Sequence, residues 1–449
     1  MTADELRKEI LDKAAEYCRT VHKADSEKPF VPNKSRINYA SRVFDENEIR
    51  NLVDASLEFW LTYGRWSKLF ERKLADYLKV KHALLVNSGS SANLLAFMSL
   101  TSPLLGERRI KRGDEVITVA AGFPTTVAPI IQYGAIPVFV DVELNTANID
   151  ASLLEEAWSP RTKAVMIAHT LGNPFDVKKV KSFCERHDIW LVEDNCDALG
   201  STYAGRFTGT WGDIGTSSFY PPHHLTMGEG GAVYTDNPLL KKIALSLRDW
   251  GRDCWCESGV DNTCGCRFTR QFGSLPVGYD HKYVYSHFGY NLKATDLQAS
   301  IGCAQLDKFP SFVEARKRNF ARLHDGLCDL PQLQLCEKYP ESDPSWFGFL
   351  MTVKPDAGFT RNELAGHLER ANIQTRNLFA GNITKHPCFT EMREGADYRI
   401  AGTLANTDTI MDSSLWIGVY PGMNDGKIEF MVKTIRSFAN SRRRPPIAG

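Results

Sequence analysis

The chain lacks an excess of charge of either sign, and it lacks long apolar runs. Its 449 residues contain 54 lysines and arginines against 54 aspartates and glutamates, so the formal net charge is zero. This balance is not typical of nucleic-acid-binding proteins, which carry a basic excess, nor of disordered charged proteins. No apolar run approaches the ~20 residues of a membrane span, and residues 1–23 contain no signal-peptide core. We therefore expect a cytoplasmic protein that binds neither nucleic acid nor a membrane.

Cysteine, in contrast, is abundant. The chain has eleven cysteines, and a cytoplasmic protein keeps them as thiols rather than as disulfides. Cys254, Cys256, Cys264 and Cys266 fall within thirteen consecutive residues. Such a cluster in a reducing compartment indicates a metal site.

Short runs rich in valine and isoleucine alternate with helical segments over most of the chain. This alternation predicts an α/β fold with a large, mainly parallel sheet covered by helices. The predicted strands are bounded by Gly, Pro, Asp or Asn. They cover residues 82–88, 115–120, 136–142, 164–170, 189–194, 214–220 and 232–235.

The predicted organisation has three parts. Residues 1–51 form a helical segment, in which Thr2 and Glu5 have the spacing of a capping box. Residues 52–292 form the large, cofactor-binding domain, with a cysteine-rich insertion at about 253–282. Residues 293–449 begin with a long linker helix and continue in a smaller C-terminal α/β domain.

Two motifs follow predicted strands, at the edge where an open α/β sheet binds its ligands. The small polar segment from Asn87 to Asn93 opens a helix, whose N-terminus favours an anion such as a phosphate. An ordinary strand–helix turn explains this segment equally well. Asp194 ends another strand and could pair with a protonated ring nitrogen, although an aspartate there is more often a cap.

A third motif, from Ser217 to Gly231, joins a strand, a proline-rich turn and a glycine-rich return. It contains His223 and His224 in succession. An isolated histidine pair is more often structural. A histidine that a rigid proline turn holds opposite a phosphate site is a better candidate for a general base, because its pKa lies near neutrality.

These motifs, in this order and at this spacing, resemble the DegT/StrS-type sugar aminotransferases of the vitamin-B6 enzymes. The resemblance implies the aspartate aminotransferase type of fold, fold type I. In that family the Ser-Phe pair precedes the lysine that binds pyridoxal phosphate (PLP) as a Schiff base. Ser218 and Phe219 set the register here, and His223 occupies the lysine position. Histidine cannot form that covalent bond.

With a histidine at this position, the sequence resembles one branch of the family, the 3-dehydratases. These lyases use pyridoxamine 5'-phosphate (PMP). They remove the C3 hydroxyl of nucleotide-linked 4-keto-6-deoxyhexoses in deoxysugar biosynthesis. The resemblance implies PMP bound without a covalent bond, a homodimer with shared active sites, and His223 as the acid–base residue. It further implies that Gly89, Ser90 and Ser218 bind the cofactor phosphate, that Phe123 stacks on the cofactor ring, and that Asp194 pairs with the ring nitrogen. Asp197 lies at a cofactor-binding position where the aminotransferases usually have glutamine. Asn291 would contact the phosphate in the neighbouring subunit.

The cysteines divide this branch further. One subgroup binds a 2Fe-2S cluster through four cysteines, and its spacing is similar to that of Cys196, Cys254, Cys256 and Cys264, with 57, one and seven residues between them. That resemblance implies a CDP-linked sugar as the substrate, in the pathway that makes the 3,6-dideoxyhexoses of lipopolysaccharide O-antigens. It also implies coupling to an oxidoreductase, an NADH-dependent flavin and iron–sulfur reductase. Local spacing alone also allows a structural zinc site, and Cys266 in place of Cys264.

Two other functions stay open at this point. One is a PLP-dependent nucleotide-sugar aminotransferase, against which the absent lysine counts. The other is a non-catalytic protein that binds nucleotide sugars. The sequence does not select among CDP, TDP and GDP, and it does not select the stereochemistry of the sugar.

Overall fold

The computed structural model describes residues 1–257 and 259–442. The largest sheet in this part of the chain has eight strands, in the order β1-β9-β8-β5-β4-β2-β3-β13. Only β9 runs antiparallel to its neighbours, β1 and β8, among these described strands. The large, mainly parallel sheet predicted from the sequence is therefore confirmed. The strands of this sheet are β1 (His82–Val86), β2 (Glu115–Val119), β3 (Ile136–Val140), β4 (Thr162–Ala168), β5 (Trp190–Asp194), β8 (Ile214–Ser218), β9 (Gly231–Thr235) and β13 (Arg399–Ile400).

Helices cover both faces of this sheet, because successive strand residues point to opposite sides. In β1, Leu84 and Val86 pack in a cluster with residues of α5 and α9, whereas Ala83 and Leu85 pack with residues of α4 and α10. The α-helices are α1 (Ala3–Tyr17), α2 (Lys23–Ser26), α3 (Glu46–Glu58), α4 (Arg65–Leu78), α5 (Gly89–Ser99), α6 (Pro124–Tyr133), α7 (Leu154–Ala157), α8 (Val177–Arg186), α9 (Pro238–Arg248), α10 (Asp296–Leu327), α11 (Arg361–Arg370), α12 (Ala405–Ser413) and α13 (Asp425–Ser441).

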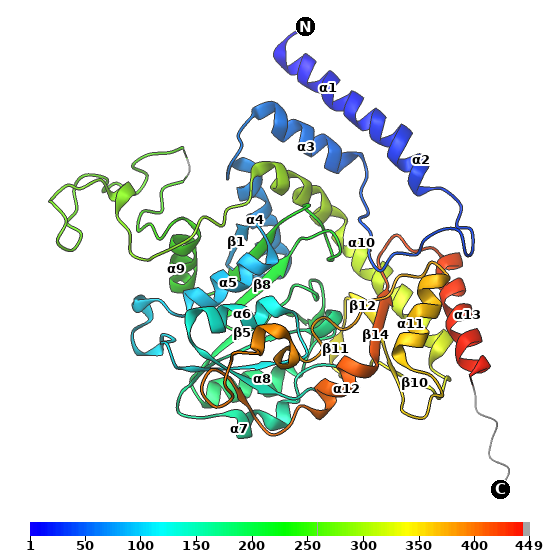
Figure 1. Ribbon diagram of the computed structural model, residues 1–449. Coiled ribbons are helices and arrows are strands. Elements are labelled where there is room, and N and C mark those ends of the chain that lie inside the picture. The colour runs from blue at the N-terminus through cyan, green and yellow to red at the C-terminus, as the bar shows by residue number, and fades with distance from the viewer. Residues whose placement is uncertain (258, 443–449) are drawn as a thin grey trace.

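The N-terminal helices lie outside this layered body, as Figure 1 shows. Helix α1 starts at the predicted capping box: the Thr2 hydroxyl accepts a hydrogen bond from the Glu5 amide, and the Glu5 carboxylate accepts one from the Thr2 amide. No helix within residues 1–257 and 259–442 is both long and apolar enough to cross a membrane.

Beyond the 32-residue helix α10, the chain forms a second, smaller sheet of antiparallel strands in the order β10-β12-β14. Between β12 and β14 the chain returns to the large sheet, where β13 pairs in parallel with β3. The remaining strands are β10 (Leu333–Leu335), β12 (Gly348–Val353), β14 (Ser414–Gly418), and the short β6 (Thr202–Tyr203), β7 (Arg206–Phe207) and β11 (Ser342–Asp343). Residues 443–449 of the predicted C-terminal domain lie outside the described residues.

Between α9 and α10 the chain forms a long excursion, residues 253–284, which we name the cysteine loop. It projects from the body of the molecule in Figure 1. Its described part contains one 3-10 turn, His281–Tyr283, and no strand. Two isolated β-bridges close its base, Asp249 with Asn291 and Arg252 with Tyr285.

Candidate active site

A cavity of about 540 Å³ opens at the carboxyl ends of the parallel strands. Ligands bind at this edge in open α/β sheets. The structure brings most of the predicted site residues together in its wall: Gly89, Ser90, Phe123, Asp194, Cys196, Asp197, Ser218 and His223. Asn291 does not line this cavity. Its exposed side chain lies at the base of the cysteine loop instead.

Asp194, the last residue of β5, presents a carboxylate that neighbouring segments hold in place. Its side chain is buried, and Oδ2 accepts hydrogen bonds from Asn93 Nδ2 and Thr126 Oγ1, both at 2.7 Å. Oδ1 accepts a third hydrogen bond from the Cys196 amide at 3.1 Å. Sequence reasoning assigned no role to Asn93 and Thr126, although both belong to motifs at strand ends.

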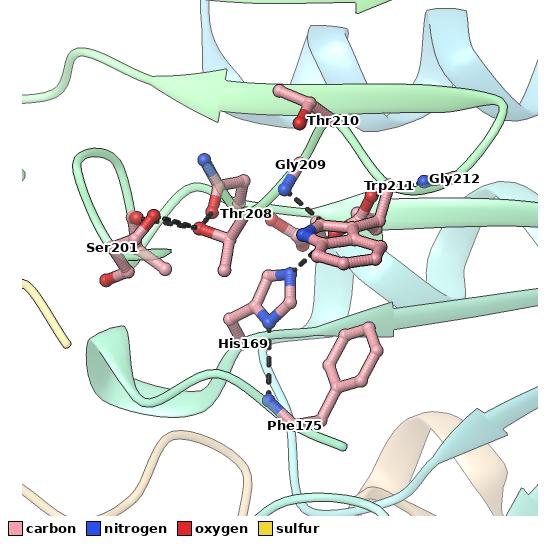
Figure 2. Close-up of polar contacts among 12 residues, drawn as sticks. His169, Phe175, Ser201, Thr208, Gly209, Thr210, Trp211 and Gly212 are labelled. Atoms are coloured by element: carbon pink, nitrogen blue, oxygen red, sulfur yellow. Dashed lines mark hydrogen bonds and ion pairs between the residues drawn. The ribbon is translucent and has the colours of Figure 1, made fainter. Parts of the chain in front are cut away.

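A buried hydrogen bond between a carboxylate and an imidazole supports β5 from the other side of the sheet. Glu193 precedes Asp194, and its Oε2 lies 3.0 Å from Nε2 of His169, with both side chains fully buried. The amides of Gly209 and Gly212 also donate to this carboxylate, at 2.8 and 2.5 Å. Burial opposes ionisation, but these hydrogen bonds and the His169 ring lower the pKa of Glu193. Figure 2 shows His169 between Phe175 and the turn that carries Gly209.

His223 lies in the turn after β8, and its Nδ1 has no hydrogen-bond partner among the described residues. Its Nδ1 is 3.5 Å from Oδ1 of Asp197, and its ring stacks on Phe347 with 5.2 Å between centroids. Arg316 of α10 donates a hydrogen bond to its backbone carbonyl at 3.2 Å. Burial lowers the pKa of His223 to about 4, so the ring is neutral near pH 7, and its pKa lies below the near-neutral value expected from the sequence.

Asp197 and His224, two further titratable residues, lie close to His223. Burial and the charge of Asp194 raise the pKa of Asp197 to about 8, so this carboxyl group carries a proton at neutral pH. His224 points into the protein, where its Nε2 lies 2.5 Å from the carbonyl oxygen of Ser345. This contact is the structural role expected of a histidine that orients the turn.

The start of α5 packs closely against β8. A Cβ atom placed on Gly89 would lie 2.3 Å from Cβ of Ser218, so only glycine permits this approach. The approach puts Ser90 and Ser218 in one wall of the cavity, next to the first amides of the helix. Hydroxyl groups and a helix N-terminus together suit an anion.

No lysine is among the described residues that line the cavity. Lys293 lies elsewhere, with Nζ 3.4 Å from the centroid of the Trp250 ring and 3.7 Å from the Asp249 carboxylate. Segments distant in sequence supply the opposite wall. Tyr39 packs edge-on against Trp416, and the exposed Arg376 lies over the Tyr39 ring at 4.1 Å. Sequence reasoning missed this wall, because no local motif marks it.

The cysteine loop brings three of the four predicted metal ligands together. The sulfur atoms of Cys254, Cys256 and Cys264 all lie within 4.8 Å of one another. A second group joins Cys264 to Cys266 and His281. Cys196 belongs to neither of these groups of described residues, because it lines the cavity beside Asp194.

Comparison with known proteins assigns the chain to a family. Residues 43–436 match the DegT/DnrJ/EryC1/StrS aminotransferase family, so the chain belongs to this family and the resemblance seen in its motifs is confirmed. The chain is 54% identical over 439 residues to the lipopolysaccharide biosynthesis protein RfbH of Salmonella typhimurium, which covers 98% of this chain and 99% of that protein.

Two further relatives carry more specific names. The dTDP-4-dehydro-2,6-dideoxy-D-glucose 3-dehydratase of Saccharopolyspora spinosa is 52% identical over 437 residues, 97% of this chain and 94% of that protein. Among solved structures, the E. coli GDP-4-keto-6-deoxy-D-mannose-3-dehydratase with bound hydrated PLP matches with a TM-score of 0.79. It is 29% identical and covers 89% of this chain and 99% of that chain. The expected fold of the PLP-dependent aminotransferases is thereby confirmed.

Proposed function

We propose that the chain is a PMP-dependent 3-dehydratase, which removes the C3 hydroxyl of a nucleotide-linked 4-keto-6-deoxyhexose. One observation carries this proposal: the cavity contains a neutral His223, and no lysine is among the described residues that line it. Relatives named as 3-dehydratases of dTDP- and GDP-linked sugars support the same reaction.

The residues of the cavity fit PMP. Ser90 and Ser218, with the amide of Gly89, would hold the phosphate at the start of α5. The Phe123 ring is 51% exposed within the cavity wall and is available to stack on the pyridine ring. The Asp194 carboxylate would pair with the ring nitrogen. When bound, PMP supplies a primary amine for the keto group of the sugar and a ring that acts as an electron sink.

The residues around His223 suit both steps of acid–base catalysis, the removal of a proton and its later donation. Its neutral ring accepts a proton and, once protonated, can donate one to the departing C3 hydroxyl. The proton on Asp197 avoids a second negative charge next to Asp194. Arg316 holds the backbone carbonyl of His223, and Phe347 stacks on its ring. At the cavity rim, the exposed Arg376 suits the diphosphate of a nucleotide sugar.

Replacement of C3–OH by C3–H releases water and consumes two electrons and two protons. The side chains of the cavity supply protons, so the electrons need an external donor. We propose an NADH-dependent flavin and iron–sulfur reductase as this donor, and a 2Fe-2S cluster, a one-electron carrier, in the thiol-rich loop. The preference for a CDP-linked substrate rests on the resemblance alone. The proposed homodimer gives the exposed Asn291 a partner to contact.

A substrate panel tests the proposed reaction. The purified protein is incubated anaerobically with PMP, a chemical one-electron reductant and CDP-, dTDP- or GDP-linked 4-keto-6-deoxyhexoses. We expect mass spectrometry to find a nucleotide sugar that lacks one oxygen, and only when PMP is present. An amino sugar formed from PLP and glutamate, or PLP trapped on the chain by borohydride, would establish an aminotransferase instead. Binding without turnover of any of these sugars would establish a non-catalytic protein.

A further inference from the structure

We propose that the thiolate metal site is completed between two copies of the chain. Cys254, Cys256 and Cys264 come from one subunit, and the fourth ligand is Cys196 of the partner subunit. The inclusion of Cys196 rests on the proposed function, because the spacing of the iron–sulfur subgroup names it. The arrangement in trans rests on the geometry of the described residues.

The cysteine loop holds three thiols ready for a metal. Their sulfur atoms lie within 4.8 Å of one another, and none of the three residues is fully buried. The amide of Cys256 donates to the sulfur of Cys254 at 3.5 Å, and the amide of Cys264 donates to the sulfur of Cys256 at 3.4 Å. Such hydrogen bonds favour thiolates and tune the metal that they bind. A tetrathiolate centre needs one more cysteine.

Cys196 of the same chain is out of reach. Cys254 and Cys256 line a surface hollow together with His82, at the start of β1. Cys196 lines the active-site cavity together with Gly89, beyond the end of β1. The five residues of β1 alone span roughly 15 Å at ~3.3 Å per residue.

The base of the loop is fixed to the body of the molecule. The bridges Asp249–Asn291 and Arg252–Tyr285 close it, and the Asp253 amide donates to the Val284 carbonyl at 2.8 Å. Because Cys254 directly follows Asp253, this closed base keeps Cys254 and Cys256 beside it.

Cys266 and His281 are engaged inside the loop. His281 is fully buried, its Nε2 lies 2.8 Å from the Asp253 carboxylate, and its Nδ1 lies 3.3 Å from the sulfur of Cys266. Phe272 stacks on its ring with 4.6 Å between centroids. The group that these two residues form with Cys264 includes neither Cys254 nor Cys256. Cys264 belongs to both groups, and its sulfur also lies 3.5 Å from Nδ1 of His281, so Cys266→Ala is the control that separates the two groups.

The end of the loop and the segment after it present an aromatic surface that suits a second copy. Tyr283, Tyr285 and Phe288 are 54%, 53% and 103% exposed, and Asn291 follows them. A concentration of exposed aromatic side chains is typical of protein–protein contacts. In a two-fold dimer each loop would meet the cavity of the other subunit, so both metal sites would be identical.

A mixed dimer tests this arrangement. Cys196→Ala with one affinity tag is co-expressed with Cys254→Ala with another, and the heterodimer is isolated by sequential purification on both tags. In trans, one of its sites loses both ligands and the other keeps all four. We expect both homodimers to lose their thiolate-bound metal and the heterodimer to keep half of the wild-type content. Iron, zinc and sulfide analyses with electron paramagnetic resonance measure that content.

Several outcomes would overturn the arrangement. A metal-free heterodimer would place all four ligands in one chain, and full metal in the Cys196→Ala homodimer would exclude Cys196 as a ligand. Loss of metal in the matched control Cys266→Ala, or a monomeric or metal-free wild type, would also reject it. Cys256→Ala replaces Cys254→Ala if the latter does not fold. A metal-loaded dimer without dehydratase turnover would reject the proposed function but not this site.

Discussion

The active-site cavity and the cysteine loop assemble reactive side chains by different means. In the cavity, Asp194 and His223 come from strand ends, and contacts from α5, α6 and α10 hold them in place. In the loop, Cys254 and Cys256 meet because they are almost adjacent in sequence, without support from any strand. The comparison teaches that a layered core brings together side chains from distant segments, whereas a projecting loop brings together side chains that are close in sequence.

The largest effect should come from removal of the imidazole in the cavity. We expect His223→Asn to lower the turnover of the 4-keto sugar by ~10²–10⁴-fold, the usual contribution of acid–base catalysis. The protein should still bind PMP and the metal of the cysteine loop, because the proposed contacts to the phosphate and the three thiols come from other residues. Turnover assays, cofactor titration and metal analysis check these three quantities. A turnover close to that of the wild type would remove His223 from the reaction.

His224→Asn is the matched control for that substitution. Its ring contacts the buried Ser345 carbonyl rather than the cavity. We expect a loss of ~1–3 kcal/mol in the free energy of unfolding, the cost of an unpaired buried group, and a smaller loss of turnover than in His223→Asn.

A second substitution compares how much buried and exposed charges stabilise the active-site cavity and the cysteine loop. We expect Glu193→Gln to lower the free energy of unfolding by ~3–5 kcal/mol, because it removes the charge of a buried pair. The pKa of Glu193 is lowered in the folded state, so this contribution is present above ~4.3, its unfolded pKa. It is lost as pH falls through the folded pKa, and the difference between the two proteins should then narrow. Urea denaturation at several pH values measures it.

The matched control is Glu257→Gln in the cysteine loop. Glu257 pairs with Lys68, but its side chain is 52% exposed. We expect a change within ~1 kcal/mol, as for other surface ion pairs. An effect as large as that of Glu193→Gln would contradict the contrast between a buried core and a solvated loop.

A further effect should be a change in the pH dependence of stability. The pKa of Asp197 is raised to about 8 by burial and by Asp194, against ~3.9 in the unfolded chain. Its contribution is complete below ~3.9 and is lost as pH rises toward about 8. We expect Asp197→Asn, which cannot ionise, to gain melting temperature relative to the wild type between about pH 5 and pH 8. A constant difference across this range would show that Asp197 does not titrate there.

The regular parts of the fold could be predicted from the sequence. Strands β2 and β5 lie within one residue of the expected runs, because each is a compact apolar segment between breakers. The positions of Asp194 and His223 could also be predicted, since each lies in a local motif at a strand end.

Contacts between distant segments could not be predicted in this way. The partners of Asp194 come from α5 and α6, and their approach depends on which strands are neighbours in the sheet. Arg316 reaches the His223 carbonyl from within a long helix that has no motif of its own. Cys196 has the spacing of a metal ligand, but spacing along the chain does not measure distance in space, and the structure separates Cys196 from the three other thiols.

The pairing of β13 with β3 has a consequence for synthesis on the ribosome. Arg399 and Ile400 cover the edge of the large sheet, and the Arg399 guanidinium reaches Glu115 at 2.8 Å. While the chain is being translated, β3 keeps an open edge, which is a template for wrong strand pairing. That edge closes only after residue 400 has emerged, so the large sheet and the C-terminal strands finish folding together.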